Sequence, residues 1–330
     1  MIPQGTQVLV TGAAGFLGSA LVEALCARGI SVRALVRRPA ALGAAEIVQG
    51  DLRDPEALAR ACEGIDLVFH TAAKAGGWGD PAEYEAVNVG GTEALLRAAH
   101  AAGVRAFVYT SSPSVVFDGR PIEGEDERLP YARRFLADYP RTKALAEKRV
   151  LDFEGLPTLA LRPHLIWGPG DRHLLPRLVA RGKRLKRVGP GDPLTDTIYI
   201  DNCVHAHLLA GARLLDAPEG VAGRPFFVSD DRPVGLWTMA NRLLEAAGAP
   251  TIRGRIPGNV ARLAATLFEA WHRLTRNPRE PLVTRFAVEQ FLAPQWYDIS
   301  AAKRDLGYAP IVTIEEGLEA LRRSFASART

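Results

Sequence analysis

The stretch VLVTGAAGFLGSALVEAL (residues 8–25) joins a short β-branched run to a segment with helical periodicity. Gly12, Gly15 and Gly18 stand between the two with GxxGxxG spacing. Glycine permits a tight turn and a close backbone approach, and the free N–H groups at a helix start attract a phosphate group. The stretch therefore predicts the strand, loop and helix of a dinucleotide-binding unit.

The segments around this unit continue the same alternation. Apolar runs predict strands at 7–10, 31–36, 47–49, 67–70, 106–110 and 157–162, and helical patterns lie at 16–28, 54–62 and 82–102. Strands that alternate with helices predict an α/β fold, with a Rossmann-type doubly wound parallel sheet. We expect a cofactor-binding domain at 1–165, to which parts of 195–230 return. We expect 166–330 to form mainly a smaller, mixed α/β substrate lobe.

One apolar helix is predicted at 259–275, within that lobe. From Val260 to Leu274, apolar residues recur at the offsets of one helix face. We expect this face to pack on the body of the protein, with a substrate lid or a membrane-surface helix as the alternatives. The segment is too short to span a bilayer.

Composition favours an ordinary globular protein. The 330 residues are 47% hydrophobic and 24% charged, with a formal net charge of +4. The charge is spread out except for a basic cluster at 183–187, which we expect to be an exposed face, so no nucleic-acid partner is indicated. The three cysteines lie far apart without metal-ligand spacing, and the N-terminus resembles no signal peptide. We therefore expect a cytoplasmic protein without a metal site.

The end of the second predicted strand bears on the cofactor. Arg37 and Arg38 stand where an acidic residue would bind the 2′-hydroxyl of NAD. Because guanidinium suits a phosphate, we favour NADP(H), with NAD(H) possible if the arginines are simply solvated.

Further residues at strand ends are expected to contact the same cofactor. Asp51 could accept from the adenine amino group while Leu52 covers the ring; alternatively, Asp51 caps a helix, although Asp54 fills that role. Ala72 and Ala73 are small enough for the cofactor to lie against the backbone. The other residues expected to line the cofactor site are Phe16, Leu17, Lys74 and Thr110.

Tyr139 and Lys143 in DYPRTK (138–143) predict acid–base chemistry. Tyrosine has an unperturbed pKa near 10 and is a poor acid–base group at neutral pH unless a cation shifts it. A lysine four residues on lies one helical turn away on the same face. Ser111, Ser112 and Ser114 follow the fifth strand, where a hydrogen-bond donor could meet a carbonyl oxygen. Each pattern is weak alone, but their order along a parallel sheet favours catalysis.

The whole chain resembles the extended short-chain dehydrogenases/reductases, in the branch similar to 3β-hydroxysteroid dehydrogenases. The motifs that carry the resemblance are TGAAGFLG, GDLRD, NVGGTEALL, YTSSPSVVF, YPRTKALAE, LRPHLIWGPGD and DTIYIDN. The resemblance implies that Tyr139 is the acid/base and that Lys143 binds the nicotinamide ribose and lowers the tyrosine pKa. It also implies that Ser112, rather than Ser111, contacts the reacting oxygen, that Pro163 lines the nicotinamide pocket, and that Asn88 is the family's helix asparagine.

Narrower features, including AAKAGGWGD and EPLVTRFAVEQFLAPQWYDIS, resemble the NADPH-dependent reductases of 2-alkyl-3-oxoalkanoates in bacterial long-chain olefin biosynthesis. The alternatives are a 3β-hydroxysteroid or sterol-4α-carboxylate 3-dehydrogenase, a nucleotide-sugar epimerase, and a non-catalytic nucleotide sensor. The resemblance also implies a homodimer through the helices that carry Asn88 and Tyr139, and association with other olefin-pathway enzymes.

An apolar substrate with a free carboxylate would need a partner on the protein. The candidates are Lys74, Trp78, His164, Arg172, His173 and Arg177.

Overall fold

The computed structural model describes residues 1–330 except 173, 182–184, 276, 278 and 328–330. Its main sheet has seven parallel strands in the order β12-β7-β5-β4-β1-β2-β3. The strands are β1 (Gln7–Thr11), β2 (Ser31–Val36), β3 (Glu46–Gln49), β4 (Leu67–His70), β5 (Ala106–Thr110), β7 (Thr158–Pro163) and β12 (Arg224–Val228). The order reverses between β1 and β4, the place where a ligand crevice forms in an open parallel sheet. The predicted fold class is confirmed.

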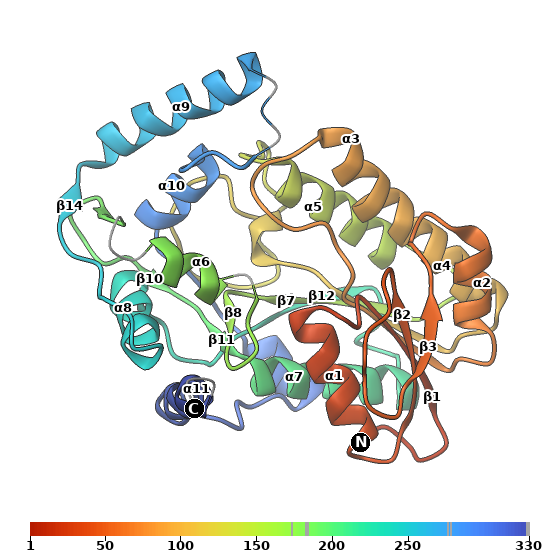
Figure 1. Ribbon diagram of the computed structural model, residues 1–330. Coiled ribbons are helices and arrows are strands. Elements are labelled where there is room, and N and C mark those ends of the chain that lie inside the picture. Colours follow the sequence, from red (N-terminus) through yellow and green to blue (C-terminus); the bar gives the residue numbers. More distant parts are fainter. Residues whose placement is uncertain (173, 182–184, 276, 278, 328–330) are drawn as a thin grey trace.

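Helices cover both faces of this sheet (Figure 1). On one face lie α1 (Phe16–Cys26) and α7 (Ile200–Asp216); on the other lie α2 (Pro55–Cys62), α4 (Gly91–Ala101) and α5 (Asp138–Leu151). Successive strand residues point to opposite faces, so β1 buries Val8 and Val10 in one core and Leu9 in the other. This alternation explains why the middle of the strand, residues 8–10, is apolar on both faces.

The helix predicted at 82–102 is interrupted. It begins as α3 (Pro81–Tyr84), continues as the π-helical segment η1 (Glu85–Gly90) and ends as α4. Periodicity alone does not distinguish a π turn from an α turn, and π turns are frequent at functional sites. The predicted helix is therefore correct in extent, and its internal geometry differs.

A smaller, mixed sheet lies beside the main one, in the order β13-β10-β15-β6. Its strands are β13 (Val234–Gly235), β10 (Leu194–Thr195), β15 (Gln295–Tyr297) and β6 (Ile122–Glu125). Two short parallel pairs join β8 (Ile166–Trp167) to β11 (Ile198–Tyr199) and β9 (Arg187–Val188) to β14 (Arg255–Ile256). Because β6 pairs with β15, a segment between β5 and α5 is tied to the C-terminal half of the chain.

The remaining helices belong to the second half, apart from one short 3₁₀ segment. They are α6 (Leu174–Arg181), α8 (Leu236–Ala246), α9 (Gly258–Leu274), α10 (Arg285–Leu292), the π-helical η3 (Ala302–Leu306) and α11 (Ile314–Ser327). The 3₁₀ segment is η2 (Pro113–Val115), directly after β5.

The orientation of α9 differs from the expectation. Its small residues Ala261 and Ala265 are buried beside Val288 of α10, whereas Leu263 and Trp271 are both 62% exposed. The helix lies at the outer edge of the molecule above α10 (Figure 1). The prediction that the apolar face packs on the body is therefore wrong, because small residues and the buried carboxylate of Glu269, paired with Arg285, anchor the helix by its other face. None of the described helices is long and apolar enough to cross a bilayer.

Candidate active site

The glycine loop leaves no room for side chains. Gly12 has φ +66°, and a Cβ atom there would lie 2.8 Å from the backbone nitrogen of Ala72. A Cβ atom on Gly18 would lie 2.2 Å from the carbonyl oxygen of Gly12. These close approaches explain why glycine is needed at both positions. They bring β1, the start of α1 and the loop after β4 together at one edge of the sheet.

The start of α1 fits an anionic group. Gly15 precedes the helix with no side-chain cap, and the first turn carries no acidic residue. The first N–H groups of a helix lack intrahelical partners and attract a phosphate. Phe16 and Leu17, both expected to contact the cofactor, lie directly after the glycine loop. The side chain of Phe16 is partly exposed, whereas that of Leu17 is buried.

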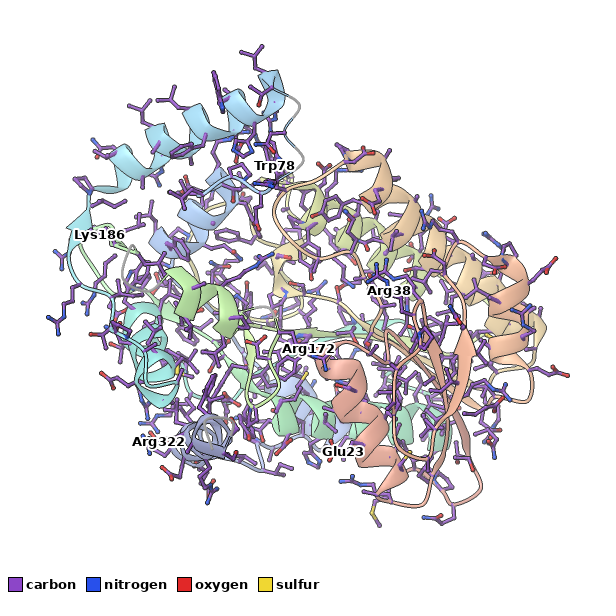
Figure 2. The ribbon with its side chains drawn as sticks, viewed as in Figure 1. Glu23, Arg38, Trp78, Arg172, Lys186 and Arg322 are labelled. Atoms are coloured by element: carbon purple, nitrogen blue, oxygen red, sulfur yellow. The ribbon has the colours of Figure 1, made fainter. Side chains whose placement is uncertain are left out.

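Arg37 and Arg38 directly follow β2, and both are exposed. Figure 2 shows Arg38 at the upper end of the main sheet. Asp51, expected near the adenine, accepts from Arg53 Nε at 2.7 Å, and this hydrogen bond helps lower the pKa of its carboxyl. Leu52 is buried, and a Cβ atom on Gly91 would lie 2.7 Å from its Cβ atom. In the described chain, Leu52 therefore packs against α4.

The loop after β4 carries Ala72, Ala73 and Lys74. Ala72 is partly buried against Gly12, and Ala73 is exposed. Lys74 Nζ donates to Glu83 Oε2 at 2.5 Å and lies 5.0 Å from the centroid of the Tyr84 ring. The charge of Lys74 is therefore already paired within the chain.

Tyr139 is the second residue of α5 and is partly buried. Burial raises the pKa of its phenol, and the neighbouring hydroxyl of Ser112 opposes that rise. Ser112 Oγ also lies 2.9 Å from Ser114 Oγ, whereas the buried Ser111 Oγ has no partner among the described residues. The structure thus brings together Tyr139 and Ser112, which the sequence analysis preferred over Ser111.

Lys143 lies one turn after Tyr139 and is 2% exposed. Its Nζ atom donates to the carbonyl oxygen of Thr110 at 2.5 Å and lies 4.0 Å from the centroid of the Tyr109 ring. Desolvation lowers the pKa of the amine to about 7, and the charge of Glu147 opposes this. The expected lowering of the tyrosine pKa by Lys143 is not seen in the chain alone, because desolvation outweighs every other influence on the phenol.

Asn88 connects three parts of the site from within the π segment. Its Oδ1 accepts from Lys74 N at 2.7 Å, and its Nδ2 donates to Lys74 O and to Thr142 Oγ1, each at 3.0 Å. Thr142 lies between Tyr139 and Lys143 on α5. The Asn88 amide therefore fixes the loop after β4 against the helix that carries the candidate catalytic pair.

Two buried charges beside Lys143 were not predicted. Arg162 of β7 and Glu147 of α5 are 2% and 0% exposed, and Arg162 Nη2 lies 2.5 Å from Glu147 Oε1. Tyr131 donates to the same carboxylate at 2.8 Å. The spacing of Tyr139, Lys143 and Glu147, each four residues apart, is a signal in the sequence that could have indicated this third member of the helix face.

The remaining predicted residues lie around this centre. Thr110 ends β5, and its Oγ1 lies 2.8 Å from His207 Nε2, while the buried Pro163 ends β7. Both therefore stand at the carboxyl edge of the sheet, where a ligand is expected.

The candidate carboxylate partners do not form one cluster. Arg177 pairs with Glu280 at 3.2 Å, and burial lowers the pKa of His164 to about 4, so its imidazole is uncharged at neutral pH. Trp78 Nε1 donates to Asn277 O at 3.4 Å. Arg172 is exposed near the start of α6 (Figure 2), and His173 lies outside the described residues.

Comparison with known sequences finds relatives over nearly the whole chain. A family model described as the 3-beta hydroxysteroid dehydrogenase/isomerase family matches residues 9–255. A 2-alkyl-3-oxoalkanoate reductase of Shewanella oneidensis is 44% identical, covering 97% of this chain and 86% of its own. One of Stenotrophomonas maltophilia is 44% identical over 97% and 100%, respectively. A 3 beta-hydroxysteroid dehydrogenase/Delta 5-->4-isomerase of Mycobacterium tuberculosis is 41% identical over 94% and 88%.

Solved structures share the fold at lower identity. "MoeE5 in complex with UDP-glucose and NAD" superposes with a TM-score of 0.74 at 25% identity, over 98% of this chain and all of its own. The structure of gox2253 gives a TM-score of 0.76 at 27% identity, over 98% and 99% of the two chains.

Proposed function

The chain belongs to the 3-beta hydroxysteroid dehydrogenase/isomerase family, and we propose that it reduces long-chain 2-alkyl-3-oxoalkanoic acids to 2-alkyl-3-hydroxy acids with NADPH. The coarser assignment follows from its relatives: it is an NAD(P)-dependent oxidoreductase that acts on a 3-oxo or 3-hydroxy group. We place the proposed reaction in bacterial long-chain olefin biosynthesis, in keeping with the resemblance in sequence.

The observation that carries the proposal is the position of Ser112 beside the phenol of Tyr139, with Lys143 one turn along the same helix. A ketone reduction needs a proton donor at the carbonyl oxygen. Because burial raises the pKa of Tyr139, its phenol is protonated at neutral pH and can donate. In the proposed reaction Tyr139 Oη gives its proton to the 3-oxygen, and Ser112 Oγ donates a hydrogen bond to the same oxygen.

The glycine loop fits a nicotinamide dinucleotide. The close approach of Gly12 to Ala72 and the uncapped start of α1 provide a backbone cradle for its pyrophosphate. When bound, the cofactor supplies the hydride for C3. We propose that Lys143 then holds the nicotinamide ribose, and that Arg37 and Arg38 bind the 2′-phosphate of NADPH.

The branched β-keto acid is favoured over a steroid by similarity. The two reductases are 44% identical to this chain, and the mycobacterial steroid dehydrogenase is 41% identical. The difference is small, so a 3β-hydroxysteroid dehydrogenase is the second candidate.

The test is a substrate and cofactor profile of the purified chain. We expect a 2-alkyl-3-oxo acid to be reduced with NADPH, a 3β-hydroxysteroid to be oxidised much more slowly, and Tyr139→Phe to lower kcat by about a thousandfold or more. Fluorescence titration should show that Tyr139→Phe still binds NADPH. Arg37→Ser with Arg38→Ser should reduce the preference for NADPH over NADH.

Two outcomes would contradict this proposal. Turnover of the steroid with none of the keto acid would make the second candidate correct. Full activity of Tyr139→Phe would remove the proposed proton donor while leaving the family assignment intact.

A further inference from the structure

The outward face of α9 is apolar over the whole length of the helix. The large apolar side chains on it are Val260 (50% exposed), Leu263 (62%), Leu267 (61%), Phe268 (39%), Trp271 (62%) and Leu274 (80%). Isolated exposed apolar residues are normal on a soluble protein, but a continuous row marks an interaction surface.

The opposite face fixes the rotation of the helix. Ala261 and Ala265 pack against the core around α10, and Glu269 is 4% exposed. Glu269 accepts from Arg285 N at 2.7 Å and from Arg285 Nε at 2.8 Å. Rotating α9 to bury its leucines would break these bonds and expose the small residues. The apolar face is therefore held outward by the packing beneath it.

Basic side chains lie at both ends of this face. Arg253 and Arg255 precede α9 and are exposed, and Lys186 Nζ lies beside Gly254. Figure 2 shows Lys186 at this end of the molecule. At the other end lie Arg273 and Arg279, both exposed. Glu269, the acid of α9, is buried and pairs with Arg273 at 3.5 Å, and Arg262 of α9 pairs with Glu289 at 2.7 Å. The positive charge that flanks the apolar face is therefore carried mainly by Arg253, Arg255, Lys186 and Arg279.

We propose that α9 docks this protein on an anionic lipid surface, lying flat with its apolar face in the headgroup region. A helix with a Leu/Phe/Trp face and basic flanks has the chemistry of interfacial helices, and anionic headgroups complement its arginines. With 17 residues, α9 is roughly 25 Å long. This is less than the thickness of the hydrocarbon core of a bilayer, so the helix is suited to lying along the membrane surface. A second copy fits less well, because a symmetric contact would bring the positive ends of two such faces together.

The docking surface is connected to the candidate active site. His272 of α9 meets the ring of Trp78 edge to face at a centroid distance of 5.8 Å. Trp78 belongs to the loop that also carries Ala72 and Lys74. Figure 2 shows Trp78 below the C-terminal end of α9. Docking would thus hold the loop after β4 close to the lipid surface.

Vesicle flotation of the purified full chain tests this proposal. We expect the protein to float with vesicles of phosphatidylcholine and phosphatidylglycerol in equal amounts, and to bind much less to phosphatidylcholine alone or at high salt. Leu263→Gln with Leu267→Gln should lower the partition coefficient by about tenfold or more. A matched control, Ile47→Gln with Ile311→Gln, removes two exposed apolar side chains far from α9 and should bind like the wild type.

The other outcomes overturn the proposal. If the wild type does not float with vesicles of any lipid composition, α9 is not the docking element. The same follows if both double variants bind to the vesicles equally well. If light scattering instead shows a dimer that Leu263→Gln with Leu267→Gln dissociates, while vesicles are not bound, the surface serves a second copy. Circular dichroism and thermal unfolding of the variants establish that each is folded.

Discussion

The buried position of Lys143 suits its proposed role but lowers the stability of the folded chain. Its amine is almost fully buried, has one carbonyl partner and lies over an aromatic ring. Burial disfavours an ammonium group, which is why its pKa falls to about 7. Natural sites that bind charged ligands often keep such groups at a cost in stability.

Lys143→Met should therefore stabilise the chain without cofactor while abolishing reduction. The folded pKa is depressed from 10.5 to about 7, so between these values the unfolded chain binds more protons, and wild-type stability rises with pH. We expect the variant to gain roughly 1–3 kcal/mol at about pH 6, and the gain to shrink toward about pH 9. Urea unfolding at several pH values measures this.

The control is Lys148→Met, one turn further along α5, where the lysine is exposed. It should show no comparable change with pH. A Lys143→Met variant that is equally destabilised at every pH would mean that its bond to Thr110 outweighs the cost of burial.

At the scale of elements, the π segment in the helix from α3 to α4 connects two parts of the candidate site. Asn88 lies in that segment and forms hydrogen bonds with both the backbone N–H and the backbone carbonyl of Lys74. Lys74 is far along the chain from the helix that carries Tyr139. Its third bond, to Thr142, reaches that helix directly. The segment thus transmits the position of the loop after β4 to the acid–base pair.

Asn88→Ala should lower the free energy of unfolding by about 1–3 kcal/mol, because it leaves the buried polar groups around Lys74 and Thr142 without partners. We also expect kcat to fall while the pH profile of the remaining activity shifts, since Tyr139 loses its fixed placement. Asn259→Ala, at an exposed site on α9, is the control for amide removal. Loss of stability with unchanged kcat and pH profile would restrict Asn88 to a structural role.

Most of the elements were predictable, because strand and helix periods are local patterns. The GxxGxxG loop, β1, β2, β4, β5 and β7 follow from short apolar runs with glycine at their ends. The π turn at Asn88 was not predictable, since it depends on tertiary hydrogen bonds. The outward rotation of α9 was missed because its anchor, Glu269, is an acid that a sequence pattern places on the solvent side.

At the scale of the whole molecule, one core crosses both parts of the chain. The cluster that contains Val10 and Leu21 also contains Tyr297, Ile299 and Leu318. A separate core around Trp237, Leu244 and Val288 lies under α9 and α10. The pairing of β6 with β15 adds a further connection. The large sheet is therefore not isolated from the C-terminal half.

This shared core predicts one cooperative thermal transition. In calorimetry we expect a single peak that moves to higher temperature with NADP⁺, with a gain of about 2.7 kcal/mol at a hundredfold excess over Kd. NAD⁺ at the same concentration should move it less. Two peaks, of which only one responds to NADP⁺, would show that the lobes unfold independently.

The candidate site was predictable to a lesser extent than the fold. Tyr139, Lys143 and Ser112 stand in sequence order at one edge of the sheet, and the structure brings them together there. Partners such as Arg162 and Tyr131 come from distant segments and give no local pattern. Which cation would meet a substrate carboxylate also depends on side-chain pairing, as Lys74 and Arg177 demonstrate.

The π turn in the helix from α3 to α4 has a geometric consequence for the register of the helix. A π turn contains one more residue than an α turn, so the helix accommodates the equivalent of a one-residue insertion. Deleting one residue between Glu85 and Gly90 should therefore turn the π segment into regular α-helix and keep the register of the two flanking helices. Leu95 and Leu96 would stay buried against the sheet. The change would fall on the π segment itself, at the asparagine that holds the site together.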